Sequence, residues 1–256
     1  MPTADRVRPL DEPPALLPDE GAELAVLSAH LGALADEVGV GPDRPLQVVE
    51  AGCGRRWRID VGDRPLEITG VDLDPDAVAI RQATEGDLHR AVVGDLRTVD
   101  LPEGGFDAVS SSFVLEHVAG AEQVLDRFVR WTRPGGLLLL RIPDRDSVYG
   151  WATRRTPHRV HVAFRRHVIG MPGAGTAGHG PYPTVYDDVV SRRGLRAWAR
   201  WRGGTVEAEH GSSVYLARAG ALGPPLRVGV AAVAASSRHR LAGDHNNLLY
   251  VLRTPA

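Results

Sequence analysis

Residues 46–54, which read Leu-Gln-Val-Val-Glu-Ala-Gly-Cys-Gly, decide the fold. The apolar run at residues 46–50 predicts a buried strand, and Gly52 and Gly54 follow it at a turn. Glycine at such a turn lets the chain bend sharply and lets a ligand approach the backbone without meeting a Cβ atom. In doubly wound sheets ligands bind beyond the carboxyl ends of the strands, so this turn is the first candidate site.

The same kind of pattern continues along the chain on both sides of this stretch. Short apolar runs predict strands at residues 46–50, 66–71, 90–93, 106–110 and 136–142, and amphipathic periodicity predicts helices at 75–84 and 119–131. Such alternation is typical of an α/β fold with a parallel sheet covered on both faces. A helix that begins after Asp19 as its N-cap and ends near Val38 precedes it. A helix near 189–202, a strand at 205–210, a helix within 226–241 and a strand at 247–253 follow.

Three segments describe the domain organisation. Residues 1–18 contain several prolines and charges and are expected to form a mobile arm. Residues 19–256 are expected to form a single domain. Within it, the regular pattern lapses at about 145–190, which we interpret as an insert on the substrate side.

The composition excludes several kinds of chemistry. All 30 basic residues are arginine, which excludes Schiff-base lysines and the lysine of phosphate-binding loops. The single cysteine excludes an intramolecular disulfide framework and multi-cysteine metal sites. The formal charge of −2 gives no overall attraction to nucleic acid or to an anionic membrane, so we expect neither as a partner. The amino-terminal segment lacks the apolar core of a signal peptide, and we expect a cytoplasmic location.

Acidic residues end the next two predicted strands. Asp72 follows the glycines by about 20 residues, where an acidic side chain can accept hydrogen bonds from ribose hydroxyls. It could instead cap the helix at 75–84. Leu73 could cover an adenine face, and Asp95 could accept from an adenine amino group or serve as a turn residue. Together with the glycine turn, these strand ends favour a nucleotide-like ligand.

From residue 46 to 144 the chain resembles the class I S-adenosylmethionine-dependent methyltransferases, in particular the type 11-like members. The motifs are E-A-G-C-G, G-V-D-L-D, G-D-L, V-L-E-H and R-P-G-G, in the family's order. The resemblance implies a Rossmann-like, doubly wound sheet of seven mostly parallel strands with an antiparallel terminal strand at its edge. It also implies S-adenosyl-L-methionine as cofactor, bound by Glu50, Gly52, Cys53, Gly54, Asp72, Leu73, Asp95, Leu96, Ser111 and Phe113. Arg55-Arg56-Trp57 departs from the family, which often has a further small residue there.

Methyl transfer from a sulfonium is an in-line displacement that depends mainly on positioning. An acceptor hydroxyl or amine must also lose a proton, and His117 is the candidate general base, although it could instead support its loop. The insert suggests substrate-side residues: His158, His161, Arg165, Arg166, Tyr182 and Tyr186. Its arginines suit an anionic acceptor or form a solvated basic face. His158 and His161 lack a third ligand at clear spacing, so we expect no metal site.

The sequence therefore predicts methyl transfer to the oxygen or nitrogen of a small-molecule acceptor, and it leaves a homodimer open. A nicotinamide-dependent oxidoreductase is the first alternative, but Trp57 stands where its third glycine would be. A catalytically silent cofactor-binding or scaffold protein is the second. A nucleic-acid amino-methyltransferase is disfavoured, because Ser-Ser-Ser-Phe at residues 110–113 replaces its proline-containing motif.

Overall fold

An eight-stranded sheet forms the centre of the computed structural model, which describes residues 7–167, 170, 172–173, 175, 182–213, 223–238 and 240–256. The strand order is β1-β7-β8-β6-β5-β2-β3-β4. Five strands run parallel to one another: β2 (Leu46–Ala51), β3 (Leu66–Asp72), β4 (Leu88–Val93), β5 (Phe106–Ser112) and β6 (Thr132–Pro143). These are the five strands predicted from the apolar runs, and the α/β fold class is confirmed.

The other end of the sheet differs from the expectation in two ways. The terminal strand β8 (Asn247–Arg253) is antiparallel, as expected, but it lies between β6 and β7 (Thr205–Ser212) rather than at the edge. An eighth strand, β1 (Ala15–Leu17), pairs in parallel with β7, so part of the expected mobile arm belongs to the sheet. The physical reason is that β7 without it would expose a row of unpaired backbone groups.

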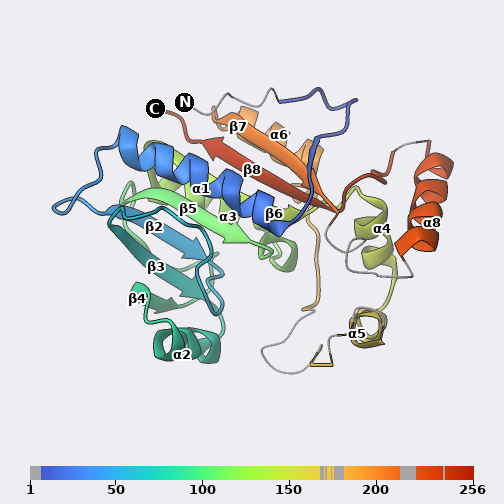
Figure 1. Ribbon diagram of the computed structural model, residues 1–256, viewed down its shortest axis with the longest axis horizontal. Helices are drawn as coiled ribbons and strands as arrows, with labels where there is room; N and C mark the ends of the chain where they lie inside the picture. Colours follow the sequence, from blue (N-terminus) through green and yellow to red (C-terminus); the bar gives the residue numbers. More distant parts are fainter. Residues whose placement is uncertain are drawn as a thin grey trace.

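Helices cover both faces of the sheet, as Figure 1 shows. Successive side chains of a strand point to opposite faces. Leu137 and Leu139 of β6 therefore belong to the core that includes Leu27 and Leu31 of α1 (Glu20–Glu37). The intervening β6 leucines belong to the second core, which contains buried residues of α3 (Ala121–Trp131) and α6 (Arg192–Trp201).

Capping side chains fix where two of the helices begin. Asp19 accepts a hydrogen bond from the Ala22 N–H at 2.9 Å and begins α1 as predicted. The helix α2 (Pro75–Thr84) has the predicted bounds, but its N-cap is Asp74. The Asp74 carboxylate accepts from the N–H groups of Asp76 and Ala77. Asp74 therefore caps α2, and Asp72 does not fill the capping role that the sequence allowed for it.

Three helices lie beyond the edge of the sheet where β6 ends and β8 begins (Figure 1). They are α4 (Val148–Arg155), α5 (His158–His167) and α8 (Gly223–Ser236). Of these, α4 and α8 are in contact. The short helix η1 (Leu115–His117) follows β5 and precedes α3. Among the helices that the structure describes, none combines the length and the apolar character needed to cross a membrane.

Candidate functional site

The turn after β2 forms a cradle of backbone. Gly52 and Gly54 have φ values of +72° and +53°, which residues with a side chain rarely adopt. A Cβ atom on Gly52 would lie 2.2 Å from Cγ2 of Val114, so glycine is required for Val114 to pack there. A Cβ atom on Gly54 would meet nothing within 4 Å. The backbone at Gly54 is therefore open to a ligand.

Asp72, at the end of β3, holds this turn. Its Oδ2 accepts a hydrogen bond from the Gly54 N–H at 2.9 Å, and its Oδ1 accepts from the Asp74 N–H at 3.0 Å. Each carboxylate oxygen has capacity for a further bond. Asp72 can therefore accept from two neighbouring hydroxyls while it fixes the turn. Leu73 beside it is 71% exposed and offers an apolar surface.

Arg81 of α2 lies beneath the turn and was missed by the sequence reasoning. Its guanidinium is fully buried and donates to Glu50 Oε2 at 2.6 Å and to the Cys53 carbonyl at 2.7 Å. It also binds both oxygens of Asp87 at 2.9 Å. The available signal was its spacing of three residues from the buried Val78, which places Arg81 on the inner face of α2.

Burial changes the chemistry of two groups at this turn. It raises the pKa of Glu50 to about 8, against the opposing effect of the Arg81 guanidinium. Burial also raises the pKa of the Cys53 thiol to about 12. The thiolate is the reactive form of cysteine, so Cys53 is inert at neutral pH and serves as a small residue in the turn.

Asp95 and Leu96 follow β4, the next strand of the sheet. Asp95 Oδ1 accepts from the Arg97 N–H at 2.9 Å and from Arg97 Nε at 3.0 Å. These hydrogen bonds from Arg97 lower the pKa of Asp95. Leu96 is buried. An adenine amino group at this strand end would therefore share the Asp95 carboxylate with Arg97.

The end of β5 contributes Ser111 and Phe113. Ser111 is buried, and its Oγ has no hydrogen-bond partner among the described residues. Phe113 has a φ of +58°, and its N–H donates to the Arg141 carbonyl at 2.8 Å. The Arg141 guanidinium lies 4.9 Å from the centre of the Phe113 ring and donates from Nε to Glu23 Oε2 at 2.9 Å. Since Glu23 belongs to α1, this contact ties α1 to the end of β5.

His117 lies at the end of η1, next to the segment 182–187. Its Nδ1 is 2.7 Å from the Pro183 carbonyl, which can only accept, so Nδ1 carries the proton. Its Nε2 is 3.6 Å from Glu116 Oε1. The Tyr182 ring packs edge-on at 5.8 Å, and the N–H of Tyr186 donates to the Glu116 carbonyl at 3.2 Å. The structure thus brings His117 close to two of the predicted substrate-side residues.

The remaining predicted substrate-side residues belong to α5. The rings of His158 and His161 are 6.3 Å apart, and His161 bonds to Thr156. Arg166 is exposed, and the Arg165 side chain lies outside the described part of the chain. Within that part, no group of three or more His, Cys, Asp or Glu side chains is arranged to hold a metal ion. The predicted set is therefore divided between the segment over η1 and α5.

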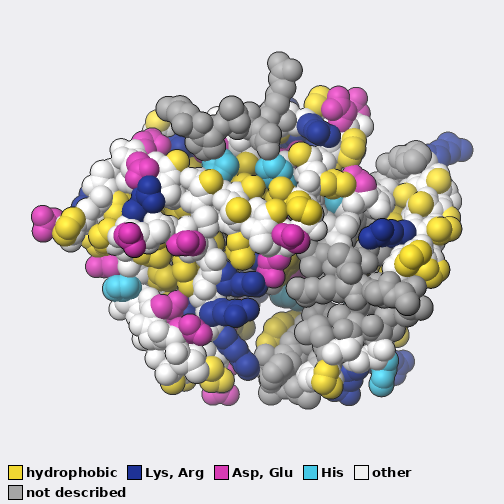
Figure 2. Space-filling view, in the orientation of Figure 1, with side chains coloured by type: hydrophobic (Ala, Val, Ile, Leu, Met, Phe, Trp, Pro, Cys, Tyr) yellow, Lys and Arg dark blue, Asp and Glu magenta, His cyan; other side chains and the backbone are white. Residues whose placement is uncertain are grey.

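Basic side chains gather on the face shown in Figure 2, next to a hollow near the middle of that face. All of them are arginines, because the chain contains no lysine. Arg55 and Arg56, which depart from the expected motif, are both exposed immediately after Gly54. Two exposed positive charges therefore follow the turn after β2 directly.

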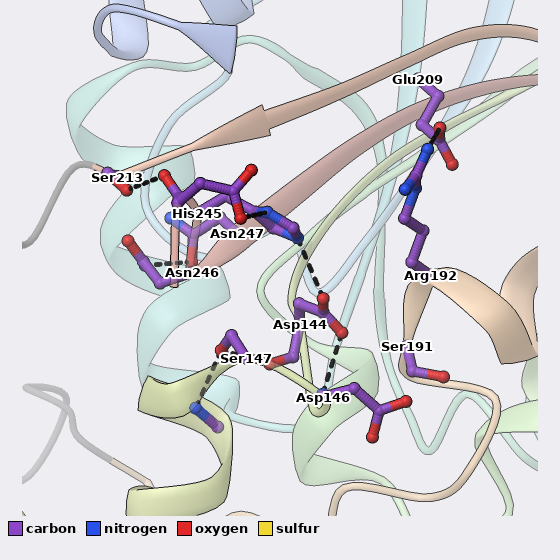
Figure 3. Close-up of polar contacts among 12 residues, drawn as sticks. Asp144, Asp146, Ser147, Ser191, Arg192, Glu209, Ser213, His245, Asn246 and Asn247 are labelled. Atoms are coloured by element: carbon purple, nitrogen blue, oxygen red, sulfur yellow. Dashed lines mark hydrogen bonds and ion pairs between the residues drawn. The ribbon is translucent and has the colours of Figure 1, made fainter. Parts of the chain in front are cut away.

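A buried polar cluster at the ends of β6 and β8 also escaped the sequence reasoning (Figure 3). His245 Nε2 is 3.0 Å from Asp144 Oδ2, and His245 Nδ1 is 3.1 Å from Asp244 Oδ1. The two carboxylates outweigh the effect of burial and raise the pKa of His245 to about 9. Asp144 and His245 are 101 residues apart in sequence, so no local pattern connects them.

Comparison with known proteins identifies the central segment. Residues 49–140 match the family model described as a methyltransferase domain. Malonyl-[acyl-carrier protein] O-methyltransferase from Serratia marcescens is 34% identical over 111 residues, which are 40% of each chain. Ubiquinone biosynthesis O-methyltransferase from Maricaulis maris is 29% identical over 186 residues, which cover 63% of this chain and 72% of that protein. The match to the first of these relatives spans only about two fifths of its length.

Comparison with solved structures shows that the chain has the fold of a methyltransferase. A Haemonchus contortus phosphoethanolamine N-methyltransferase 2, solved in complex with S-adenosyl-L-methionine, aligns with a TM-score of 0.54 at 16% identity. The alignment covers 93% of this chain and 53% of that protein. At this identity the likeness concerns the fold alone. Residues 49–140 therefore match a methyltransferase domain, and the chain shares its fold with a methyltransferase of known structure.

Proposed function

We propose that the protein transfers the methyl group of S-adenosylmethionine to an oxygen or nitrogen atom of a small-molecule acceptor. The observation that carries the proposal is the Asp72 carboxylate, which holds the open Gly54 turn and retains capacity to accept further hydrogen bonds. That arrangement occurs within the segment that matches a methyltransferase domain.

The residues present fit this cofactor. Gly54 has open space where a Cβ atom would be, which suits a ligand lying against the backbone. Asp72 would accept from the two ribose hydroxyls, and the exposed Leu73 would cover the adenine. Ser111, buried at the end of β5, would lie beneath the methionine end. When bound, the cofactor supplies a methyl group activated by its sulfonium.

The chain's own contribution to the reaction is alignment and proton removal. Phe113 is held by the Arg141 carbonyl and guanidinium, so its ring can exclude water from the methyl-transfer path. His117 is the proposed base for an acceptor hydroxyl or amine. Because its Nδ1 donates to the Pro183 carbonyl, Nε2 is the nitrogen that would take the proton. The names of the O-methyltransferase relatives favour oxygen as the accepting atom.

An assay with methyl-deuterated S-adenosylmethionine tests the proposal. The purified chain is incubated with a panel of phenols, alcohols and amines, and mass spectrometry follows both the demethylated cofactor and the labelled product. We expect label in at least one acceptor, together with an equal amount of S-adenosylhomocysteine. Binding of the cofactor without transfer to any acceptor would favour the silent cofactor-binding alternative.

His117→Asn and His117→Gln test the proposed base. Asparagine keeps a donor near the position of Nδ1, so the contact with the Pro183 carbonyl and the fold should persist. We expect the rate constant of transfer in both variants to fall by about 100-fold or more, since general-base catalysis typically contributes 10²–10⁴. A merely structural His117 would give an asparagine variant with the parent rate and the parent pH profile.

A further inference from the structure

Arg141 is a buried cation at the end of β6, next to the end of β5. The strand register pairs it with Ser112, one residue before Phe113. Its guanidinium donates from Nε to Glu23 Oε2 at 2.9 Å and from Nη2 to Glu20 Oε1 at 3.1 Å, and both carboxylates belong to α1. Apolar residues in place of a buried ion pair are often equally stable or more stable. Stability alone therefore does not explain an arginine that directly follows four leucines in this strand.

Arg141 also holds the backbone that follows β5. Phe113 has a φ of +58°, and a residue with a side chain keeps such a conformation only where its surroundings impose it. Arg141 supplies two of the contacts that do so. Its carbonyl accepts from the Phe113 N–H at 2.8 Å, and its guanidinium lies 4.9 Å from the centre of the Phe113 ring.

Val114 connects this segment to the turn after β2. A Cβ atom on Gly52 would lie 2.2 Å from Cγ2 of Val114, so the valine side chain packs directly against the glycine. Because Phe113 precedes Val114 in the chain, the conformation of Phe113 determines how Val114 meets the turn. Arg141 therefore acts on the turn after β2 through these two residues.

A second series of contacts connects Arg141 to the other side of the same turn. Glu20 Oε1, which accepts from Arg141, also accepts from Arg58 Nη1 at 2.5 Å. Arg58 lies four residues after Gly54, in the segment that leads away from the turn. Since both arginines share one carboxylate oxygen, the start of α1 connects the end of β6 with this segment.

We propose that Arg141 is a positioning residue for the methyl donor. Through Phe113 it holds the segment after β5 against the turn after β2, and through Glu20 it holds the segment that leaves the turn. Both sides of the proposed cofactor site thus depend on one guanidinium. Arg141 is 6% exposed, and it acts through these neighbours rather than by contact with the donor. This inference rests on the proposed function.

Arg141→Met and Arg192→Met form a matched pair of variants that separates positioning from stability. Both arginines are buried, and each donates to a buried glutamate, Glu23 for Arg141 and Glu209 for Arg192. The other hydrogen bonds of the Arg192 side chain go to backbone carbonyls within residues 8–12. Arg192 is thus a buried, paired arginine outside the contacts that reach the turn.

Calorimetric titration with S-adenosylmethionine and unfolding by denaturant give the outcomes for this pair. Both variants should be less stable than the parent. We expect Arg192→Met to keep the parent Kd and Arg141→Met to raise the Kd by about tenfold. Arg141→Lys, which keeps the charge but not the fork of donors, should restore part of the affinity. Without ligand, hydrogen exchange at the Phe113 N–H should be faster in Arg141→Met and unchanged in Arg192→Met.

Glu20→Gln and Asp36→Asn test the link through α1 and leave both buried groups of the Arg141–Glu23 pair in place. Each removes an α1 carboxylate that binds an arginine of the segment after the turn, Arg58 for Glu20 and Arg64 for Asp36. Both carboxylates are partly or largely exposed, so this pair also decides the matter if Arg141→Met fails to fold. We expect a Kd about threefold higher in Glu20→Gln and the parent value in Asp36→Asn.

The same titrations distinguish failure of this inference from failure of the proposed function. The parent Kd in Arg141→Met, together with a loss of stability like that of Arg192→Met, would overturn the inference and leave the proposed function standing. An equal rise in Kd in both methionine variants would also overturn it, because the effect would then be a general loosening of the fold. Equal Kd values in Glu20→Gln and Asp36→Asn would overturn the link through α1. A parent chain that binds no S-adenosylmethionine would contradict the proposed function and this inference together.

Discussion

The β2–β5 half of the sheet and the β6–β8 half hold their polar groups in different ways. In the β2–β5 half, which carries the proposed cofactor site and is called the cofactor half below, a carboxylate accepts from backbone N–H groups over short sequence distances. Asp72 and Gly54, for example, are 18 residues apart. At the other half, side chain binds side chain across the whole chain, as in Asp144–His245, 101 residues apart. A site built on backbone leaves a local sequence motif, whereas a site built on distant side chains leaves none.

We expect the largest loss of stability from a substitution of Arg81, which supports the turn after β2. Arg81→Leu would leave Glu50, Asp87 and the Cys53 carbonyl without their shared donor inside the protein. Removing one member of a buried ion pair costs about 3–5 kcal/mol, so we expect a loss of that size in the free energy of unfolding by denaturant. Arg64→Leu, which breaks the exposed pair with Asp36, is the control and should keep the parent midpoint.

The contribution of the β6–β8 half to stability should depend on pH through His245. The folded pKa of His245 is about 9, above its ordinary value of 6.5, so its stabilising contribution is full below about pH 6.5 and is lost as the pH rises through 9. The loss is on the order of 3 kcal/mol. Glu50, with a folded pKa of about 8, acts in the same direction.

Denaturant unfolding between pH 6 and 9.5 separates these two contributions. The parent should lose stability as the pH rises, and His245→Gln should lose less over the same interval. Glu50→Gln would remove only the part that belongs to the cofactor half. Parallel profiles for the parent and His245→Gln would show that His245 is not held as a buried cation.

Asp72→Ala tests whether Asp72 in the cofactor half binds the ribose of S-adenosylmethionine. The substitution removes two charged acceptors for the ribose hydroxyls, each worth about 1.5–3 kcal/mol, so we expect the Kd for S-adenosylmethionine to rise by about 100-fold or more. Asp72→Asn keeps one acceptor oxygen and should lie between the parent and the alanine variant. An unchanged Kd in Asp72→Ala would refute the ribose role.

Ser111→Ala should have the smallest effect and an unusual sign. Removing a buried hydroxyl without a partner should raise the free energy of unfolding of the ligand-free protein by about 1 kcal/mol. The same change should leave the affinity for the cofactor close to that of the parent, because the Ser111 hydroxyl has no accessible surface. Ser110→Ala is the neighbouring control on the other face of β5 and should bring no gain in stability, because the Ser110 hydroxyl is not an unpartnered buried group.

Residues that act through their neighbours in sequence could be predicted. Asp19 as an N-cap, the bounds of α2, the bounds of β8 and the glycine turn all follow from short-range propensity and spacing. The position of Asp72 at the end of a strand could be predicted, while the capping role open to it belongs to Asp74, two positions later in the same turn. Both residues can cap a helix, and only the backbone conformation distinguishes them.

Features that depend on distant partners could not be predicted. The strand β1 exists because β7 offers an edge nearly 200 residues later in the chain. Arg81 stands in a helix whose pattern does not reveal that Glu50 and Asp87 will surround its guanidinium. A cavity of about 380 Å³ lies between α4 and α8 and exists only because these two helices, far apart in sequence, are in contact. Each depends on tertiary packing rather than on local propensity.

The most direct test of the central claim is a calorimetric titration of the full chain with S-adenosylmethionine and, separately, with NAD. We expect saturable binding of one S-adenosylmethionine per chain and no saturable binding of NAD. Binding of NAD with no binding of S-adenosylmethionine would contradict it and would favour the oxidoreductase alternative.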